Sequence, residues 1–178
     1  MRCSSALSSL ALAATASGLV LPRTCLFPEP EYQICYDSEG ATPQNLDTRE
    51  VAYVAKYLRA YQDQSVKQGR SPFWKMSFPE ADNCAEWQVT TKGGTWVMAK
   101  LVGDGAAAVT FYDIANTIHG GATPNDAEKK KSLVNCGTAG GQMGVIINGT
   151  DPLYQSKEFV DGGFTNKGIV IKLVHNPN

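Results

Sequence analysis

The chain lacks most of the residue patterns by which enzyme active sites are recognised. It contains only two histidines, His119 and His175, and no G-x-S-x-G motif, so the nucleophile elbow of the α/β-hydrolases is absent. Its cysteines form no C-x-x-C pair, which argues against a zinc site. His119 falls at the end of a predicted helix, where the helix dipole favours a cation. We therefore predict no catalytic residue, no metal ion and no cofactor.

An excess of either charge is also missing. The 178 residues include 16 Lys and Arg against 17 Asp and Glu, a formal net charge of −1. Because this leaves no global cationic field, the sequence predicts no nucleic-acid partner. Apolar residues make up 43% and charged residues 19%, which is typical of a globular domain. Beyond the N-terminus no run of about 18 apolar residues occurs, so we predict no stable membrane insertion.

The N-terminus has the pattern of a secretory signal peptide. Met1-Arg2-Cys3 gives a short basic start, and residues 6–20 are small or apolar and uncharged. Ala14-Thr15-Ala16 fits the small-x-small cleavage rule, so we predict a signal peptide over residues 1–16 and a single secreted domain over residues 17–178. A cut near Gly18 and a buried N-terminal helix are the alternatives.

Cleavage would leave an even number of cysteines, which in an exported chain indicates two disulfides. The four are Cys25, Cys35, Cys84 and Cys136. Four cysteines allow three pairings, and the spacing does not choose among them. The sequon Asn148-Gly149-Thr150 predicts an N-glycan on Asn148 if the producing organism is a eukaryote.

The best helix signal covers residues 47–69. Asp47 and Glu50 have the spacing of a capping box, and Gly69 suits a left-handed end with Pro72 beyond it. One face repeats apolar residues at steps of three and four: Val51, Val54, Ala55, Leu58 and Tyr61. We interpret this face as packing on a sheet; the alternative is docking to a membrane or a partner.

The rest of the chain reads mainly as strands. Residues 86–90 and 95–101 flank Lys92-Gly93-Gly94 and predict a β-hairpin. Further strands are predicted over residues 106–112, 142–149 and 168–174. Residues 17–46, which precede the long helix, are predicted to form an irregular arm.

A second helix is predicted to start with Asp113 as its cap and to stop at Gly120-Gly121. The element order predicts an α+β fold, a mainly antiparallel β-sheet with two α-helices packed on one face. This is an α/β sandwich, here stapled by disulfides.

Few residues suggest chemistry. Glu86 with Asp113 or Asp104 could form a carboxylate pair for glycoside hydrolysis, but an exposed charge on an edge strand explains Glu86 equally. A Cys84–His119 dyad is disfavoured, because a cysteine in an oxidising compartment is expected to be paired. The tripeptide Gly140-Gly141-Gln142 is interpreted as a loop leading into a strand.

Aromatic residues gather in the less regular parts of the chain: Tyr32, Tyr36, Phe73, Trp74 and Phe78. Exposed aromatic side chains can anchor a glycan or a protein partner, so the first four are candidate binding residues. The alternative is that they close the ends of the sandwich.

Taken together, several segments resemble a known family. Cys35 before an amphipathic helix, then "NCAEW", "TWVMAKL", "FYDIANTI" and "NCGTAGGQMGVII", resembles the fungal secreted effectors known as necrosis-inducing factors. Those are small extracellular proteins of plant-associated ascomycetes. The likeness spans Cys35 to Val174. The tail "DPLYQSKEFVDGGFTNKGIVIKLV" also resembles the killer toxins of smut fungi, which are α/β sandwiches with an antiparallel sheet.

One departure from the resemblance affects the disulfides. The family usually has a cysteine after the hairpin turn, near Val97 or Met98, whereas this chain has Cys25 instead. With that change, we expect Cys25 to pair with Cys84 and Cys35 to pair with Cys136.

The resemblance implies a secreted effector that acts by binding a host-plant or microbial protein or glycan and induces cell death, and it transfers no catalytic residues to this chain. We expect the protein to be a monomer. A small secreted hydrolase of cell-wall glycans and a killer-toxin-like antifungal protein are the alternatives.

Overall fold

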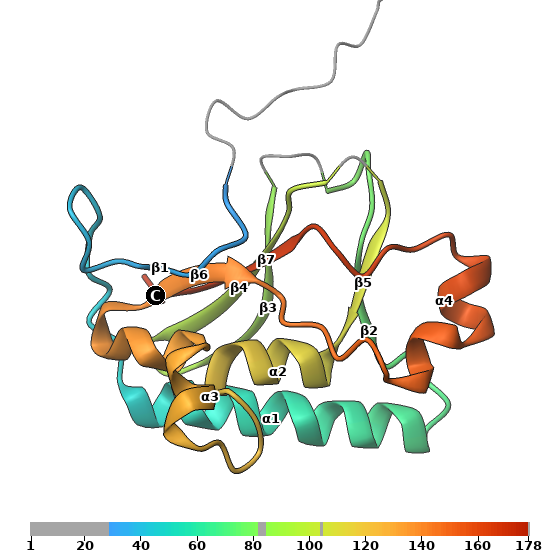
Figure 1. Ribbon diagram of the computed structural model, residues 1–178, viewed down its shortest axis with the longest axis horizontal. Coiled ribbons are helices and arrows are strands. Elements are labelled where there is room, and N and C mark those ends of the chain that lie inside the picture. The colour runs from blue at the N-terminus through green and yellow to red at the C-terminus, as the bar shows by residue number, and fades with distance from the viewer. Residues whose placement is uncertain (1–28, 82–84, 104, 178) are drawn as a thin grey trace, which may run out of the picture.

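The computed structural model describes residues 29–81, 85–103 and 105–177, and it confirms the α+β class. A layer of strands lies above a layer of helices, in which α1 (Thr48–Lys67) and α2 (Phe111–His119) run side by side (Figure 1). Shorter helices lie at the margins: α3 (Asp126–Lys130), α4 (Lys157–Asp161), and the 3-10 helices η1 (Leu133–Ala139) and η2 (Pro152–Gln155). None of the described helices is long and apolar enough to cross a membrane.

Two antiparallel sheets form the upper layer. The larger has the order β1-β6-β7-β4-β3. Its strands are β1 (Ile34–Cys35), β6 (Gly141–Gly144), β7 (Ile169–His175), β4 (Thr95–Leu101) and β3 (Glu86–Lys92). The smaller pairs β2 (Phe73–Met76) with β5 (Ala107–Thr110). The C-terminal strand β7 therefore lies at the centre of the larger sheet, and β3 lies at its edge.

The predicted hairpin is present. Lys92 pairs with Thr95, which leaves Gly93 and Gly94 as a two-residue turn, and Gly93 has a φ of +53°. A positive φ is strained for residues with a side chain, so glycine is favoured in this turn.

The central strands β4 and β7 separate two different environments. On the helix side, their side chains are almost completely buried: Thr95, Val97, Ala99, Leu101, Ile169, Ile171 and Leu173. The opposite side, called the outer face below, includes Lys100 and Lys172. This alternation follows from the two-residue period of a strand. It places the hydrophobic core between the larger sheet and the helices.

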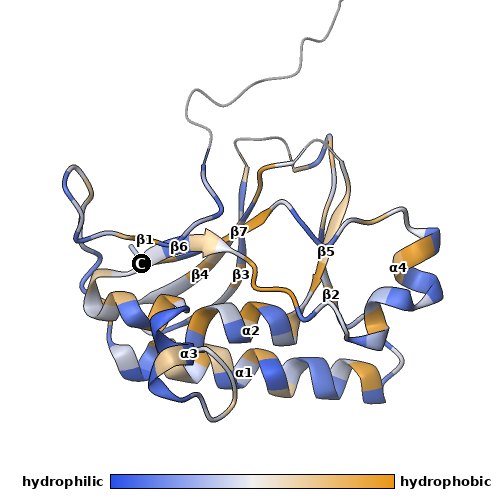
Figure 2. Ribbon diagram, viewed as in Figure 1, coloured by the Kyte–Doolittle hydropathy of each residue, from blue (hydrophilic) through white to orange (hydrophobic). Residues whose placement is uncertain are grey.

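Helices α1 and α2 close the core from below. Val51, Val54, Ala55 and Leu58 of α1 are buried as predicted, whereas Tyr61 is only half-buried. Figure 2 shows hydrophobic and hydrophilic residues alternating along both helices, as expected for helices with one face on a core.

Both predicted helix starts differ in detail. Asp47 caps α1 by accepting a hydrogen bond from the Arg49 amide, but Glu50 does not complete a capping box. Its Oε2 accepts hydrogen bonds from Gly94 N at 3.0 Å and Thr95 Oγ1 at 3.3 Å, and so joins α1 to the hairpin. A tertiary contact thus replaces the local one.

The prediction that Asp113 caps the second helix was wrong. Thr110 is the N-cap, and its hydroxyl accepts a hydrogen bond from the Asp113 amide. The helix therefore begins at Phe111, and residues 111 and 112, predicted as strand, are its first turn. Gly120, with a φ of +81°, ends α2 as predicted.

Glycines allow the N-terminal arm to lie close against β6. A Cβ at Gly141 would lie 2.5 Å from the carbonyl oxygen of Ile34, and one at Gly144 would lie 2.8 Å from Glu31 Cβ. The described part of the arm is therefore not entirely irregular, because it supplies β1. A strand does follow Gly140, but β6 spans Gly141–Gly144, so it begins one residue earlier than the strand predicted over residues 142–149 and ends five residues sooner.

A disulfide between Cys35 and Cys136 fixes this contact, with a Cα–Cα distance of 5.1 Å. The expected Cys35–Cys136 bond is thus present. Cys25 and Cys84 lie outside the described residues, so their pairing stays a prediction.

The paired substitution Cys35→Ser/Cys136→Ser should lower the free energy of unfolding by about 4–5 kcal/mol. The bond joins residues 101 positions apart, and closing a loop of that length restricts the unfolded chain. Urea unfolding followed by circular dichroism measures the change. A loss below about 1 kcal/mol would contradict the expectation, and replacing both cysteines avoids a free thiol that could exchange.

Candidate functional site

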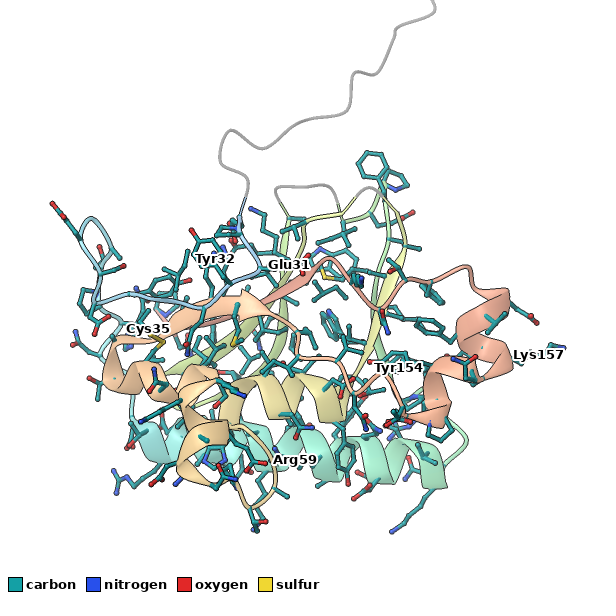
Figure 3. The ribbon with its side chains drawn as sticks, in the orientation of Figure 1. Glu31, Tyr32, Cys35, Arg59, Tyr154 and Lys157 are labelled. Atoms are coloured by element: carbon teal, nitrogen blue, oxygen red, sulfur yellow. A yellow bond between two sulfur atoms is a disulfide. The ribbon has the colours of Figure 1, made fainter. Side chains whose placement is uncertain are left out.

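The structure does not bring the four predicted binding aromatics together. Tyr32 lies on the N-terminal arm with 70% of its surface exposed, on the side of the sheet away from α1 and Arg59 (Figure 3). Tyr36 donates a hydrogen bond to Gln142 Oε1 at 3.0 Å on the outer face. Phe73 is buried in a small cluster with Tyr154, Phe159 and Ala108. It therefore fits the alternative interpretation, in which the aromatic residues close the ends of the sandwich. Trp74 borders a groove beside helix α1.

That groove runs between helix α1 and strand β3 and was not predicted. Tyr53, Tyr57 and Tyr61 follow one another at four-residue steps along α1. Side chains spaced in this way lie on one side of a helix. Tyr53 and Tyr57 are 48% and 43% exposed. Together with Trp74 and the facing residues of β3, these tyrosines form what we call the tyrosine groove.

The tyrosine groove contains two adjoining cavities of about 260 and 320 Å³, which share Tyr57. The first is lined by Tyr57, Leu58, Tyr61, Trp74, Val89 and Phe111. The second is lined by Tyr53, Tyr57, Gln88, Thr90, Thr91 and Lys92. Tyr53 and Lys92 also border a third hollow of about 320 Å³ at the start of α1.

Aromatic contacts hold the inner end of the tyrosine groove. The Tyr61 and Phe111 rings meet edge to face with centroids 4.8 Å apart, and Trp74 lies 6.4 Å from Phe111 in a similar arrangement. The indole Nε1 of Trp74 is buried and has no hydrogen-bond partner. A buried donor without an acceptor is unfavourable by about 1–3 kcal/mol.

Each end of the tyrosine row carries a cation. Lys92 Nζ lies 4.8 Å from the ring centroid of Tyr53, and the guanidinium carbon of Arg70 lies 5.8 Å from that of Tyr61. Among the described residues, neither cation forms an ion pair with a carboxylate. Each end of the row therefore carries a cation, although Glu50 and Asp47 border the same hollow as Lys92.

The sequence contained a signal for this site. Tyrosines at positions 53, 57 and 61 form a continuous stripe beside the buried face of the predicted helix. The signal was missed because Tyr61 was assigned to the buried face, and the aromatic residues considered for binding were those in loops.

The outer face of the sheet carries a different polar cluster. Glu29 Oε1 accepts hydrogen bonds from Lys100 Nζ at 2.7 Å and Lys172 Nζ at 2.8 Å, and Lys172 also donates to Glu86 Oε1 at 2.5 Å. Both lysines are less than 10% exposed. Tyr36, Glu86 and Lys172 border a shallow hollow of about 320 Å³ beside this cluster.

Burial and charge act in opposite directions on this cluster. Burial alone would raise the pKa of Glu29, but the hydrogen bonds and positive charges of Lys100 and Lys172 lower it below its ordinary value of 4.5. Burial, together with the negative charges of Glu29 and Glu86, raises the pKa of Tyr36. We assign the cluster a structural role, because the two carboxylates neutralise two buried lysines.

Of the two candidate carboxylate pairs for hydrolysis, Glu86 and Asp113 do not come together. Asp113 is 1% exposed and accepts hydrogen bonds from the Tyr154 hydroxyl at 2.5 Å and from Asn148 N at 3.3 Å. Burial raises the pKa of Asp113, although these hydrogen bonds oppose the shift. Asp113 lies on α2, on the helix side of the sheet, whereas Glu86 lies on the outer face. Asp104 is outside the described residues.

The remaining predicted positions are the sequon at Asn148 and the histidine His119. Asn148 is exposed, and its side-chain oxygen accepts a hydrogen bond from the Thr150 hydroxyl at 2.8 Å, so the sequon is accessible. His119 lies half-buried at the end of α2, and its supposed partner Cys84 is not described. In the described ranges, no group of His, Cys, Asp and Glu could hold a metal ion.

No family model, curated protein or solved structure matches this chain. The resemblance to the necrosis-inducing effectors therefore stays a prediction.

The substitution Glu29→Gln should lower the free energy of unfolding by about 2 kcal/mol at pH 7, because it leaves the buried Lys100 ammonium without its carboxylate partner. The folded-state pKa of Glu29 is below 4.5, so its contribution is fully present above pH 4.5. That contribution is lost as the pH falls through the folded-state pKa. Denaturant unfolding at several pH values measures the difference between the two proteins.

Glu158→Gln is the matched control. Glu158 pairs with Lys75 at the surface, where both side chains are more than a third exposed, so its loss should change stability by less than about 1 kcal/mol. Equal effects of the two substitutions, or an effect of Glu29→Gln that does not diminish as the pH is lowered below 4.5, would contradict the assignment.

Proposed function

We propose that this chain is a secreted protein of the effector type, which acts by binding a protein or glycan of a host plant or competing microbe. Its binding site is the tyrosine groove. The observation that carries the proposal is the row of Tyr53, Tyr57 and Tyr61 facing β3, with the unsatisfied Trp74 indole at its inner end. Large aromatic side chains are enriched among residues that dominate binding energy.

Export is supported by the cysteine chemistry. A structural disulfide such as Cys35–Cys136 persists in oxidising compartments and is rare in the cytosol of most organisms. Together with the predicted signal peptide over residues 1–16, this bond favours an extracellular protein.

Binding is preferred over hydrolysis because of what surrounds the acidic candidates. Lys172 neutralises Glu86, and the Tyr154 hydroxyl and the Asn148 amide donate to Asp113 on the other side of the sheet. A glycosidase needs two carboxyl groups that flank one bond, about 5 to 9.5 Å apart. A killer-toxin-like antifungal protein is the other alternative, and growth of a sensitive fungus in its presence tests it.

The test is infiltration of the purified mature protein into leaves of a panel of plants. Wild-type protein should elicit cell death or a defence response, and Tyr53→Ser/Tyr57→Ser should reduce its potency about tenfold or more, because it removes two exposed anchor residues. Tyr32→Ser is the matched control, since this tyrosine is more exposed but lies on the other side of the sheet. It should act like wild type.

Two parallel assays address the alternatives. Release of reducing sugars from cell-wall polysaccharides, abolished by Glu86→Gln or Asp113→Asn, would replace the proposal with hydrolysis. Full activity of the double tyrosine variant, with unchanged circular dichroism, would remove the tyrosine groove as the binding site. Inhibition of fungal growth instead of a leaf response would identify a microbial target.

A further inference from the structure

The tyrosine groove has a backbone wall as well as an aromatic one. Strand β3 is the last strand of the larger sheet, and no described strand pairs with its outer edge. Such an edge presents unpaired N–H and C=O groups, which are able to bond another extended chain. The register shift between Gln88 and Thr90 interrupts this edge, so its regular part is Thr90–Lys92.

The cavity beside Tyr53 and Tyr57 lies along this edge. Thr90 pairs with Val97, which faces the helices, whereas Thr91 pairs with Trp96, which faces the other way. Both threonines line the same cavity. Because successive residues of a strand point to opposite faces, a cavity that touches both wraps the outer edge of β3.

The spacing of the tyrosines matches an extended chain. A step of four residues along a helix rises about 6 Å. Two residues of a strand span about 6.6 Å. Lys92 lies beside Tyr53 and Val89 beside Tyr57 and Tyr61, so β3 and α1 run alongside one another in opposite directions. Alternate side chains of a strand added to β3 would therefore fall between successive tyrosines.

Charge defines the chemistry of this added strand. Lys92 and Arg70 stand at the two ends of the tyrosine row, and no described carboxylate pairs with either. An acidic side chain near each end would supply the missing partners.

From these observations we infer that the tyrosine groove takes an extended peptide with acidic residues near both ends, which adds as a strand to the outer edge of β3. The inference rests on the proposed binding function and specifies its ligand class. Backbone hydrogen bonds would supply affinity, and the tyrosine-lined cavities would select alternate side chains. A glycan could stack on the tyrosines but would make no use of the strand edge.

The probes for the test are two pools of end-blocked nonapeptides. Both vary Val, Ile, Thr and Tyr at the central five positions; one has two Glu at each end and the other has two Lys. Fluorescence polarisation should show binding of the Glu pool about tenfold or more tighter than of the Lys pool. Nuclear magnetic resonance should show shifts at the amides of Thr90, Thr91 and Lys92.

Two variants test the charges. Arg70→Glu/Lys92→Glu should abolish or reverse the preference for the Glu pool. Lys130→Glu/Lys167→Glu is the control, because it reverses the same number of exposed charges away from the tyrosine groove and should leave the preference unchanged. The best single peptide from the Glu pool is then made in two N-methylated versions, each methylated at the alternate residues of one edge. The version methylated on the edge that faces β3 should bind about tenfold more weakly, because methylation removes backbone donors.

The outcomes separate this inference from the proposed function. Absence of binding by the Glu pool, equal binding of both pools, or unchanged binding after N-methylation on either edge would overturn strand addition. If a panel of plant cell-wall oligosaccharides instead bound wild type and not Tyr53→Ser/Tyr57→Ser, the tyrosine groove would remain a binding site and the peptide inference would fail. If peptides bound but the leaf response survived that double substitution, the proposed function would fail instead.

Discussion

The alternation of side chains along β4 and β7 is the constraint on which the rest of the structure depends. One face of these two strands is apolar and must be covered, which places α1 and α2 beneath the sheet. The other face carries Lys100 and Lys172, whose ammonium groups cannot be buried without partners. Glu29 from the arm and Glu86 from β3 supply those partners. The sheet is thus closed by hydrophobic packing on one side and by ion pairs on the other.

The larger sheet has two edge strands, of which β3 is the longer. At the other end of the sheet, β1 pairs with β6, and the Cys35–Cys136 disulfide holds it there. The glycines of β6 permit this because a Cβ at Gly141 or Gly144 would collide with the arm. Among the described strands of the larger sheet, β3 therefore offers the longer unpaired edge for an interaction that uses backbone groups.

The walls of the tyrosine groove are held together before any ligand arrives. Glu50 of α1 bonds to the amide of Gly94 and the hydroxyl of Thr95, at the turn that ends β3. At the opposite end, Tyr61 and Trp74 both pack on Phe111. A groove whose walls are fixed at both ends loses little conformational freedom on binding, which favours affinity.

The sequence by itself determined the α+β class, the β-hairpin at Gly93-Gly94, the long helix and its buried face, because these follow from local periodicity and turn chemistry. It determined only part of the helix caps: Asp47 and Gly120 act as predicted, whereas Glu50 and Asp113 bond to residues distant in the chain. Nor did it reveal the candidate site: Tyr53, Tyr57 and Tyr61 are evident as a stripe, but only the tertiary structure places them beside an unpaired strand edge. Strand order depends on long-range pairing that no local pattern encodes, and the site is a consequence of that order.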